Sequence, residues 1–187
     1  MKTIQVICLV RLSALFALAL GCVLSFGSPS GAAQPPHAHP GGQNAAPQIG
    51  APAIPFDLKT LDGKSINLVS YRGKPLMINF FATWCDPCRE EMPLINELAA
   101  QAEKNDYNVL AIAVEDSRAA VTEYVKESKL IFPIALDLNS TVKRAYRIFG
   151  PPATFFIDSQ GIIRDVVIGP LSRERLSTAL KNAGWGK

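Results

Sequence analysis

Histidine is nearly missing from this sequence: only His37 and His39 occur among its 187 residues. The chain after His39 therefore offers no histidine as the base of a cysteine protease or as a metal ligand. A His-x-His pair can bind a metal, but this one stands in a stretch rich in proline and glycine without further ligands. We interpret the pair as part of a solvated linker and expect no metal in the protein.

Acidic residues are missing before Asp57, and the only basic residues before that point are Lys2 and Arg11. The whole chain has 19 lysine and arginine residues against 16 aspartate and glutamate residues, so the part from Asp57 onward is nearly neutral. Such a domain has no strongly basic face on which phosphate contacts could dominate the affinity. Nucleic acid is therefore not expected as a partner.

The first 26 residues have the pattern of an export signal. Lys2 and Arg11 flank or interrupt an apolar run that begins at Ile4, and residues 12–26 carry no charge. A basic start followed by an apolar core directs a chain out of the cytosol. We expect the domain in an extracytoplasmic compartment, the bacterial periplasm.

Three fates of this leader remain open. Gly31 and Ala33 are small residues suited to a cut before Gln34, which would release a soluble protein. Residues 19–22 resemble a lipoprotein cleavage box, in which Cys22 becomes the lipidated first residue. Alternatively the leader stays as a membrane anchor, although residues 12–26 are fewer than the roughly 20 that span a bilayer.

Composition divides the rest of the chain into two parts. Residues 27–52 form a predicted linker, rich in proline, glycine, alanine and glutamine and without charge. Residues 53–187 are expected to form one domain, since a chain of this length usually builds a single core. Its short apolar strands alternate with amphipathic helices, which predicts an α/β fold with a mixed central sheet and an N-terminal β-hairpin.

The apolar pattern sets the expected boundaries of these elements. Strands are expected over residues 56–58, 66–68, 75–81, 108–114, 132–136, 153–157 and 162–168. Helices are expected over residues 86–104, 118–128, 139–146 and 172–182. Pro93 should kink the first helix, and Asn139 or Ser140 should cap the third.

Cys85 and Cys88 stand where a predicted strand meets a predicted helix. Two intervening residues allow their sulfurs to form a disulfide. The helix N-terminus offers backbone N–H groups and a positive dipole end to the sulfur of Cys85, which lowers its pKa and favours the thiolate. Cys88 lies a turn deeper and can attack a mixed disulfide formed by Cys85. We therefore predict Cys85 as nucleophile and Cys88 as resolving cysteine.

The two residues between these cysteines have predicted effects of their own. Pro87 suits the first turn of a helix, where its missing N–H costs nothing and its fixed φ fits. The carboxylate of Asp86 stands beside the expected thiolate and should raise the pKa of Cys85 compared with a neutral residue there. That direction favours a reductant over a strong oxidant.

A Cys-x-x-Cys pair can also be half of a zinc site or a structural disulfide. Zinc would need two further ligands, whereas the remaining cysteines, Cys8 and Cys22, lie in the leader. A structural disulfide would persist in an oxidising compartment, but this one would close a loop too small to constrain much of the unfolded chain. A redox role is therefore favoured.

Residues 80–88, Phe-Phe-Ala-Thr-Trp-Cys-Asp-Pro-Cys, are followed by Arg-Glu-Glu-Met-Pro at 89–93. This motif resembles that of the TlpA/ResA-like branch of the thioredoxin superfamily, and the resemblance runs from about Ile49 to the C-terminus. It implies a thioredoxin-like fold and a thiol-disulfide oxidoreductase that reduces client proteins, such as apocytochrome c or a metal-site assembly factor. A membrane thiol reductase would supply the electrons, and no cofactor is implied.

The same resemblance brings further residues to the site. Pro152 is implied to be the cis-proline that faces the cysteines in this family. Pro151 departs from the family pattern and lacks an N–H, so one backbone donor to the substrate is lost there. From its position beside Cys85, Trp84 is expected to cover the sulfur of that residue, and ordinary packing is the alternative.

An acidic residue near the cysteines is another feature of the family. Glu115 and Asp116 both follow the predicted strand at 108–114, and Asp116 is the closer match, although the family form is commonly Gly-Glu. A partly buried carboxylate there would have a raised pKa and could exchange a proton with Cys88. The alternative is a solvated turn that caps the next helix.

Two other functions on the same fold serve as alternatives. Peroxiredoxin-like peroxidases have threonine or serine three residues before a lone peroxidatic cysteine, whereas this chain has Ala82 there and adds Cys88. A copper-delivery or redox-inactive binding module would normally add a distant histidine ligand, which the predicted domain lacks.

Overall fold

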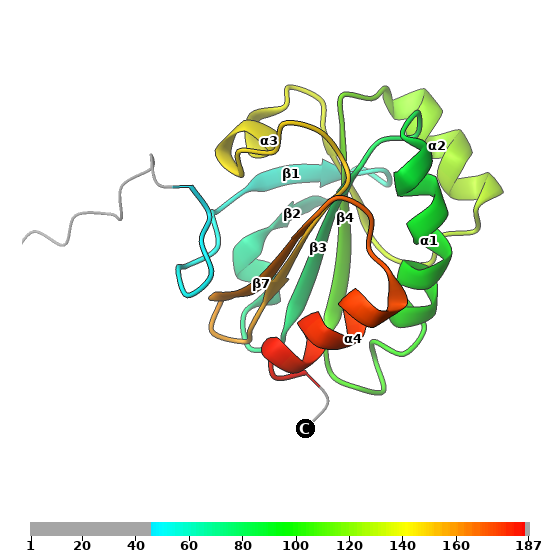
Figure 1. Cartoon of the computed structure of the whole chain (residues 1–187). Coiled ribbons are helices and arrows are strands. Elements are labelled where there is room, and N and C mark those ends of the chain that lie inside the picture. Colours follow the sequence, from blue (N-terminus) through cyan, green and yellow to red (C-terminus); the bar gives the residue numbers. More distant parts are fainter. Residues whose placement is uncertain (1–45, 186–187) are drawn as a thin grey trace, which may run out of the picture. The chain divides into compact units, whose positions relative to one another are not determined.

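A computed structural model describes residues 46–185 of the chain (Figure 1). The expected export signal, the lipidation candidate Cys22, the His37 and His39 pair and most of the predicted linker lie outside the described residues. Within the part that is described, no helix is both long enough and apolar enough to cross a membrane.

Seven strands form one mixed sheet in the order β2-β1-β5-β4-β3-β6-β7. The strands are β1 (Asp57–Thr60), β2 (Ser65–Asn67), β3 (Leu76–Phe81), β4 (Asn108–Val114), β5 (Ile134–Asp137), β6 (Ala153–Ile157) and β7 (Ile163–Ile168). In the centre, β3, β4 and β5 run parallel, while the outer strands on both sides are antiparallel to their neighbours. The predicted α/β fold with a mixed sheet and an N-terminal hairpin is confirmed.

The central strands are buried on both faces, as their apolar sequences predict. All residues of β3 and of β6 are buried, and successive side chains of a strand point to opposite faces. Met77 therefore joins the core under α1, α2 and α4, and Ile78 joins a second core with α3 (Figure 1). The helices are α1 (Asp86–Ala99), α2 (Arg118–Glu127), α3 (Thr141–Ala145) and α4 (Arg173–Asn182).

The first helix ends earlier than predicted, because α1 stops at Ala99 and not near residue 104. Tyr107 explains the difference: its hydroxyl donates to the carbonyl oxygen of Leu98 at 2.6 Å. Its ring also stacks on Trp185, with 4.8 Å between the centroids. These tertiary contacts reverse the chain toward β4 and override the helical spacing. Pro93 lies inside α1, as expected.

The prediction that the side chain of Asn139 or Ser140 caps the third helix is wrong, because another side chain accepts the hydrogen bonds. Ser140 occupies the N-cap position of α3, but its side chain makes no capping hydrogen bond. The buried carboxylate of Asp137 accepts instead from the N–H of Thr141 at 2.9 Å and from that of Lys143 at 2.7 Å. A side chain at the end of β5 thus satisfies the free N–H groups of the helix start.

The hairpin region differs in its boundaries. A 3-10 helix, η1 (Leu68–Tyr71), follows β2 where the pattern predicted that the strand would continue through Leu68. The side chain of Asn67 accepts from the N–H of Ser70 at 3.0 Å and so caps this turn. Upstream of β1, the N–H of Gly50 donates to the Ile163 carbonyl at 2.8 Å, so backbone pairing with β7 begins a few residues before position 53.

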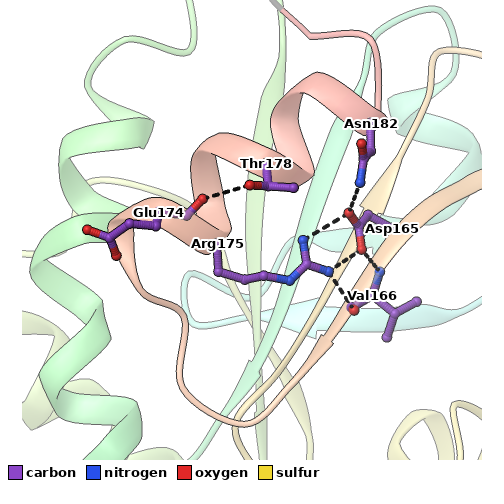
Figure 2. Close-up of polar contacts among 6 residues, drawn as sticks. All are labelled: Asp165, Val166, Glu174, Arg175, Thr178 and Asn182. Carbon is purple, nitrogen blue, oxygen red and sulfur yellow. Dashed lines mark hydrogen bonds and ion pairs between the residues drawn. The ribbon is translucent and has the colours of Figure 1, made fainter.

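The last helix is attached to the sheet through a buried carboxylate (Figure 2). Asp165 on β7 is 3% exposed and accepts hydrogen bonds from Arg175, from Asn182 at 2.7 Å and from the N–H of Val166 at 2.7 Å. The Arg175 guanidinium, followed by the other donors, lowers the pKa of Asp165 against the opposing effect of burial. This charged cluster fixes α4 against β7.

Candidate active site

The sheet topology brings four loops to one edge of the sheet. Because β3, β4 and β5 are parallel, the segments after Phe81, Val114 and Asp137 leave the sheet at the same end. Because β6 is antiparallel to β3, the residues before Ala153 enter at that end too. The cysteines, the acidic turn at 115–116, α3 and the proline pair therefore converge there.

Cys85 and Cys88 form a disulfide at this edge, with 5.2 Å between their Cα atoms. Cys85 is the N-cap residue of α1, and its Sγ lies 3.3 Å from the N–H of Cys88, which points toward it. Cys85 is 6% exposed, whereas Cys88 is fully buried. An incoming group thus reaches the sulfur of Cys85 first, and this sulfur is the one that the helix N-terminus stabilises as a thiolate.

The proline pair lies against the disulfide. The peptide bond between Pro151 and Pro152 is cis, as the resemblance implied. The carbonyl oxygen of Pro151 is 3.6 Å from the Sγ of Cys85. Pro152 is buried and Pro151 is half-buried, so the carbonyl side of this loop forms the wall next to the reactive sulfur.

The acidic turn after β4 contacts the loop that precedes the cysteines. One carboxylate oxygen of Asp116 accepts from the N–H of Thr83 at 2.7 Å, and the other accepts from the N–H of Ser117 at 2.9 Å. The carbonyl oxygen of Glu115 accepts from the indole N–H of Trp84 at 3.0 Å. The turn therefore holds both residues before Cys85, while proton exchange between Asp116 and Cys88 stays a prediction.

The remaining residues singled out in the sequence surround the disulfide. Trp84 is 59% exposed, so a large apolar surface faces solvent beside Cys85. Asp86 is exposed and begins α1, and Pro87 occupies the adjacent position of its first turn. Ala82, at the position where a peroxidase would need a hydroxyl, is fully buried and has no polar side-chain atom.

Sequence reasoning missed Glu91, a buried carboxylate one turn after Cys88. Glu91 is 3% exposed and accepts from the side-chain amide of Asn79 at 2.7 Å and from the N–H of Leu171 at 2.7 Å. Burial raises the pKa of Glu91 despite these two donors. Its spacing, three residues after Cys88 and four before Ile95, places it on the buried face of α1 and could have revealed it.

The arrangement can carry out thiol-disulfide exchange. A sulfur at a helix N-terminus serves as nucleophile and leaving group, and a second sulfur behind it closes the disulfide. Within residues 46–185, no group of three or more histidine, cysteine, aspartate or glutamate side chains is arranged to hold a metal ion.

Comparisons with known proteins agree with this chemistry. A sequence model of the AhpC/TSA family matches residues 49–166. The thiol-disulfide oxidoreductase ResA of Geobacillus thermodenitrificans is 34% identical over 140 residues, which cover 75% of this chain and 80% of that protein.

Solved structures give the same result. A thiol:disulfide interchange protein of the thioredoxin family from Chlorobium tepidum has a TM-score of 0.65 and 32% identity over 74% of this chain and 99% of its own. The pneumococcal exposed lipoprotein thioredoxin Etrx1 from Streptococcus pneumoniae has a TM-score of 0.61 and 28% identity over 68% of this chain and 98% of its own.

The fold and the cysteine pair at the start of α1 define a protein thiol-disulfide oxidoreductase with a thioredoxin fold. Within that class, the chain belongs to the AhpC/TSA family and to the ResA-like thiol-disulfide oxidoreductases of the thioredoxin superfamily.

Proposed function

We propose that this protein reduces disulfides of client proteins outside the cytoplasm. The thiolate of Cys85 attacks a client disulfide, forms a mixed disulfide and releases one client thiolate, which takes up a proton. Cys88 then loses its proton and attacks the sulfur of Cys85, which closes the Cys85–Cys88 disulfide and releases the second client thiolate to take up a proton. Two electrons pass from the dithiol to the client, and a membrane thiol reductase returns the protein to the dithiol.

The observation that carries this proposal is the unequal placement of the two sulfurs. Cys85, whose Sγ faces the N–H of Cys88 at the start of α1, keeps some exposure, while Cys88 has none. This arrangement separates the nucleophile from the resolving thiol. Residues proposed to support the exchange surround the pair: Trp84, Asp86, Pro87, Glu115, Asp116, Pro151 and Pro152.

Exposed aromatic side chains favour a protein as the client. Phe149 is 99% exposed and Trp84 is 59% exposed. Phe149 lies two residues before Pro151, so the Cα atoms of the two residues are within roughly 7 Å of each other. The carbonyl oxygen of Pro151 in turn contacts Cys85. Transient redox complexes cover roughly 600 Å² per partner, a patch about 14 Å in radius. Phe149 and Trp84 thus fall within the area that a protein client must cover.

The proposed location rests on the leader and on one relative. The basic and apolar pattern of residues 1–26 is typical of export, and Etrx1 is described as an exposed lipoprotein. We assign this protein to the extracytoplasmic side of a bacterial membrane, in the periplasm, free or tethered there through Cys22 or an uncleaved leader. Cytochrome c maturation and metal-site assembly are the client classes that the ResA-like resemblance implies.

Reduction of insulin by the dithiol form tests the reaction. The wild-type protein should precipitate insulin chains through disulfide reduction, and Cys85→Ser should abolish this activity, while Cys88→Ser should accumulate the mixed disulfide. Full activity of Cys85→Ser would refute the role assignment. The direction of electron flow is tested by the reduction potential: a value well below about −200 mV supports a reductant, and one near about −120 mV would indicate an oxidant.

A further inference from the structure

Lys143, on the short helix α3, is a buried lysine with an ion-pair partner, at the same edge of the sheet as the disulfide. Only 7% of the residue is exposed, which is unusual for lysine. Its Nζ lies 2.7 Å from a carboxylate oxygen of Glu115, whose side chain is 44% exposed. A buried ammonium needs such a partner, since an unpaired buried charge is strongly unfavourable. The pair thus connects α3 to the turn after β4.

Glu115 occupies a backbone conformation that suits glycine better. Its φ is 52°, in the left-handed region that residues with a Cβ adopt at a cost. The same residue accepts the indole N–H of Trp84 with its carbonyl oxygen, at 3.0 Å. One residue therefore holds Lys143 with its side chain and Trp84 with its backbone.

The ion pair is not required to attach α3. The N–H groups of Thr141 and Lys143 already bind the carboxylate of Asp137, and Val142 is buried in the core. The ion pair therefore acts mainly on its other partner: it holds the turn of Glu115 and, through that turn, Trp84.

We infer that the Lys143–Glu115 ion pair is a positioning element of the redox site, which fixes the turn after β4 and thereby the indole of Trp84 beside Cys85. The inference deepens the proposed function, and rests on it, because Trp84 lies in the area that a protein client covers. Lys143 and Glu115 act through Trp84 and are positioning residues. A small disulfide needs no contact with the indole of Trp84, so its reduction does not depend on Lys143.

Two variants remove the pair from opposite sides. Glu115→Gly deletes the carboxylate, tolerates the positive φ and keeps the carbonyl oxygen that binds Trp84. Lys143→Met keeps an apolar stem of similar length and deletes the charge. Lys74→Met is the matched control. The Lys74–Asp106 pair is as short, at 2.6 Å, but it is exposed and lies near the start of β3, at the end of the strand away from the cysteines.

The first measurement is fluorine NMR of the oxidised protein labelled with fluorotryptophan, with the resonance of Trp84 assigned by Trp84→Phe. Both pair variants should shift or broaden this resonance, and the double variant should match the single ones because one interaction is lost in each case. Lys74→Met should leave the resonance unchanged. An unchanged Trp84 resonance in both pair variants would overturn the inference, whatever the activity of the protein.

The second measurement is kcat/KM of the reduced protein with insulin and with hydroxyethyl disulfide. Each pair variant should lose about fivefold with insulin, because misplaced contact groups slow a bimolecular exchange. Lys143→Met, which alters no residue proposed to take part in the exchange, should keep the wild-type rate with the small disulfide. An equal loss with both substrates in Lys143→Met, or an equal loss with insulin in Lys74→Met, would also overturn the inference. Failure of the wild-type protein to reduce either disulfide would refute the proposed function alone, since the NMR result does not depend on activity.

Discussion

The buried side-chain amide of Asn79 donates a hydrogen bond of 2.7 Å to the carboxylate of Glu91, which lies one helical turn after Cys88 on α1. The same amide donates to the hydroxyl of Thr154 at 3.0 Å, while its oxygen atom has no hydrogen-bond partner among the described residues. Strand β3, strand β6 and helix α1 are thus joined through one polar contact point in an apolar core.

Glu91→Gln should flatten the dependence of stability on pH. Burial raises the pKa of Glu91 above its ordinary value of 4.5 in the folded state. Between that value and the raised pKa, the folded state holds a proton that the unfolded state has lost, so stability falls as pH rises. Glutamine removes this titration and can still accept from the Leu171 N–H, while its amide can donate to a reoriented Asn79.

The free energy of unfolding in urea, measured from acidic to neutral pH, checks this expectation. At neutral pH the Glu91→Gln protein should be at least as stable as the wild type. Glu90→Gln, an exposed neighbour on the same helix, is the control and should keep the wild-type slope. A Glu91→Gln protein with an unchanged pH slope would contradict the assignment.

Local signals in the sequence were sufficient for the main features of the fold and for the cysteine pair. The apolar run of β3 and the spacing around Cys85 depend on neighbours along the chain, and both predictions agree with the structure. The early end of α1 depends on Tyr107, which comes from outside the helix and competes for its last carbonyl groups. The spacing of apolar residues three and four positions apart, from which the helix was predicted, carries no information on this contact between Tyr107 and Leu98.

Buried charges were the part of the site that sequence reasoning could not place. Lys143 and Glu91 are charged residues, which in most proteins face solvent. Their burial is tolerated only because Glu115, Asn79 and the backbone N–H of another segment lie at hydrogen-bonding distance. Those partners are far away in the sequence, so the tertiary fold has to be known before they can be identified.

Asp165→Asn should loosen the attachment of α4 to β7. At neutral pH the charged Asp165 accepts from Arg175, which lowers its pKa below the ordinary value of 3.8. For such an acid the stabilisation is present above the ordinary value and is lost as pH falls through the lowered one. Replacement should cost about 2 kcal/mol at neutral pH, since a partly buried charged hydrogen bond is lost.

Chemical denaturation at neutral and at strongly acidic pH measures this effect. The difference between Asp165→Asn and the wild type should shrink at acidic pH, where the wild-type carboxylate is itself protonated. Asp106→Asn breaks an exposed ion pair with Lys74 and should change stability little. A constant difference at all pH values would show that shape, and not charge, accounts for the contribution of Asp165.

Asp86→Asn should make the protein a weaker reductant. The exposed carboxylate of Asp86 stands next to the thiolate of Cys85 and opposes its ionisation, so a neutral residue should lower the pKa of Cys85. A more stable thiolate favours the reduced form, so the reduction potential should rise by roughly 15 mV. That is about half of the shift that corresponds to a tenfold change in the equilibrium constant of a two-electron couple. Ultraviolet absorbance of the thiolate against pH and equilibration with glutathione measure the two quantities, with Glu90→Gln as control. A potential that falls would reverse the proposed effect of Asp86.

Phe149→Ala should slow the reduction of protein disulfides and leave small disulfides unaffected. The ring of Phe149 is almost completely exposed, two residues before the proline whose carbonyl oxygen contacts Cys85. A protein client that docks over this disulfide can bury the ring, and loss of that apolar contact should lower kcat/KM with insulin by about fivefold. Hydroxyethyl disulfide has little apolar surface to bury against the ring, so its rate should not change.

Val69→Ala is the matched control for this substitution. Val69 is 73% exposed but belongs to η1, and Gly73 shortly after it donates to the Ser159 carbonyl in the turn between β6 and β7. That turn lies at the opposite end of β6 from Pro152, outside the area that a client covers when it reacts with Cys85. If Phe149→Ala and Val69→Ala reduce insulin at the same rate, the exposed ring takes no part in client binding, and selectivity for proteins must come from Trp84 and the proline loop alone.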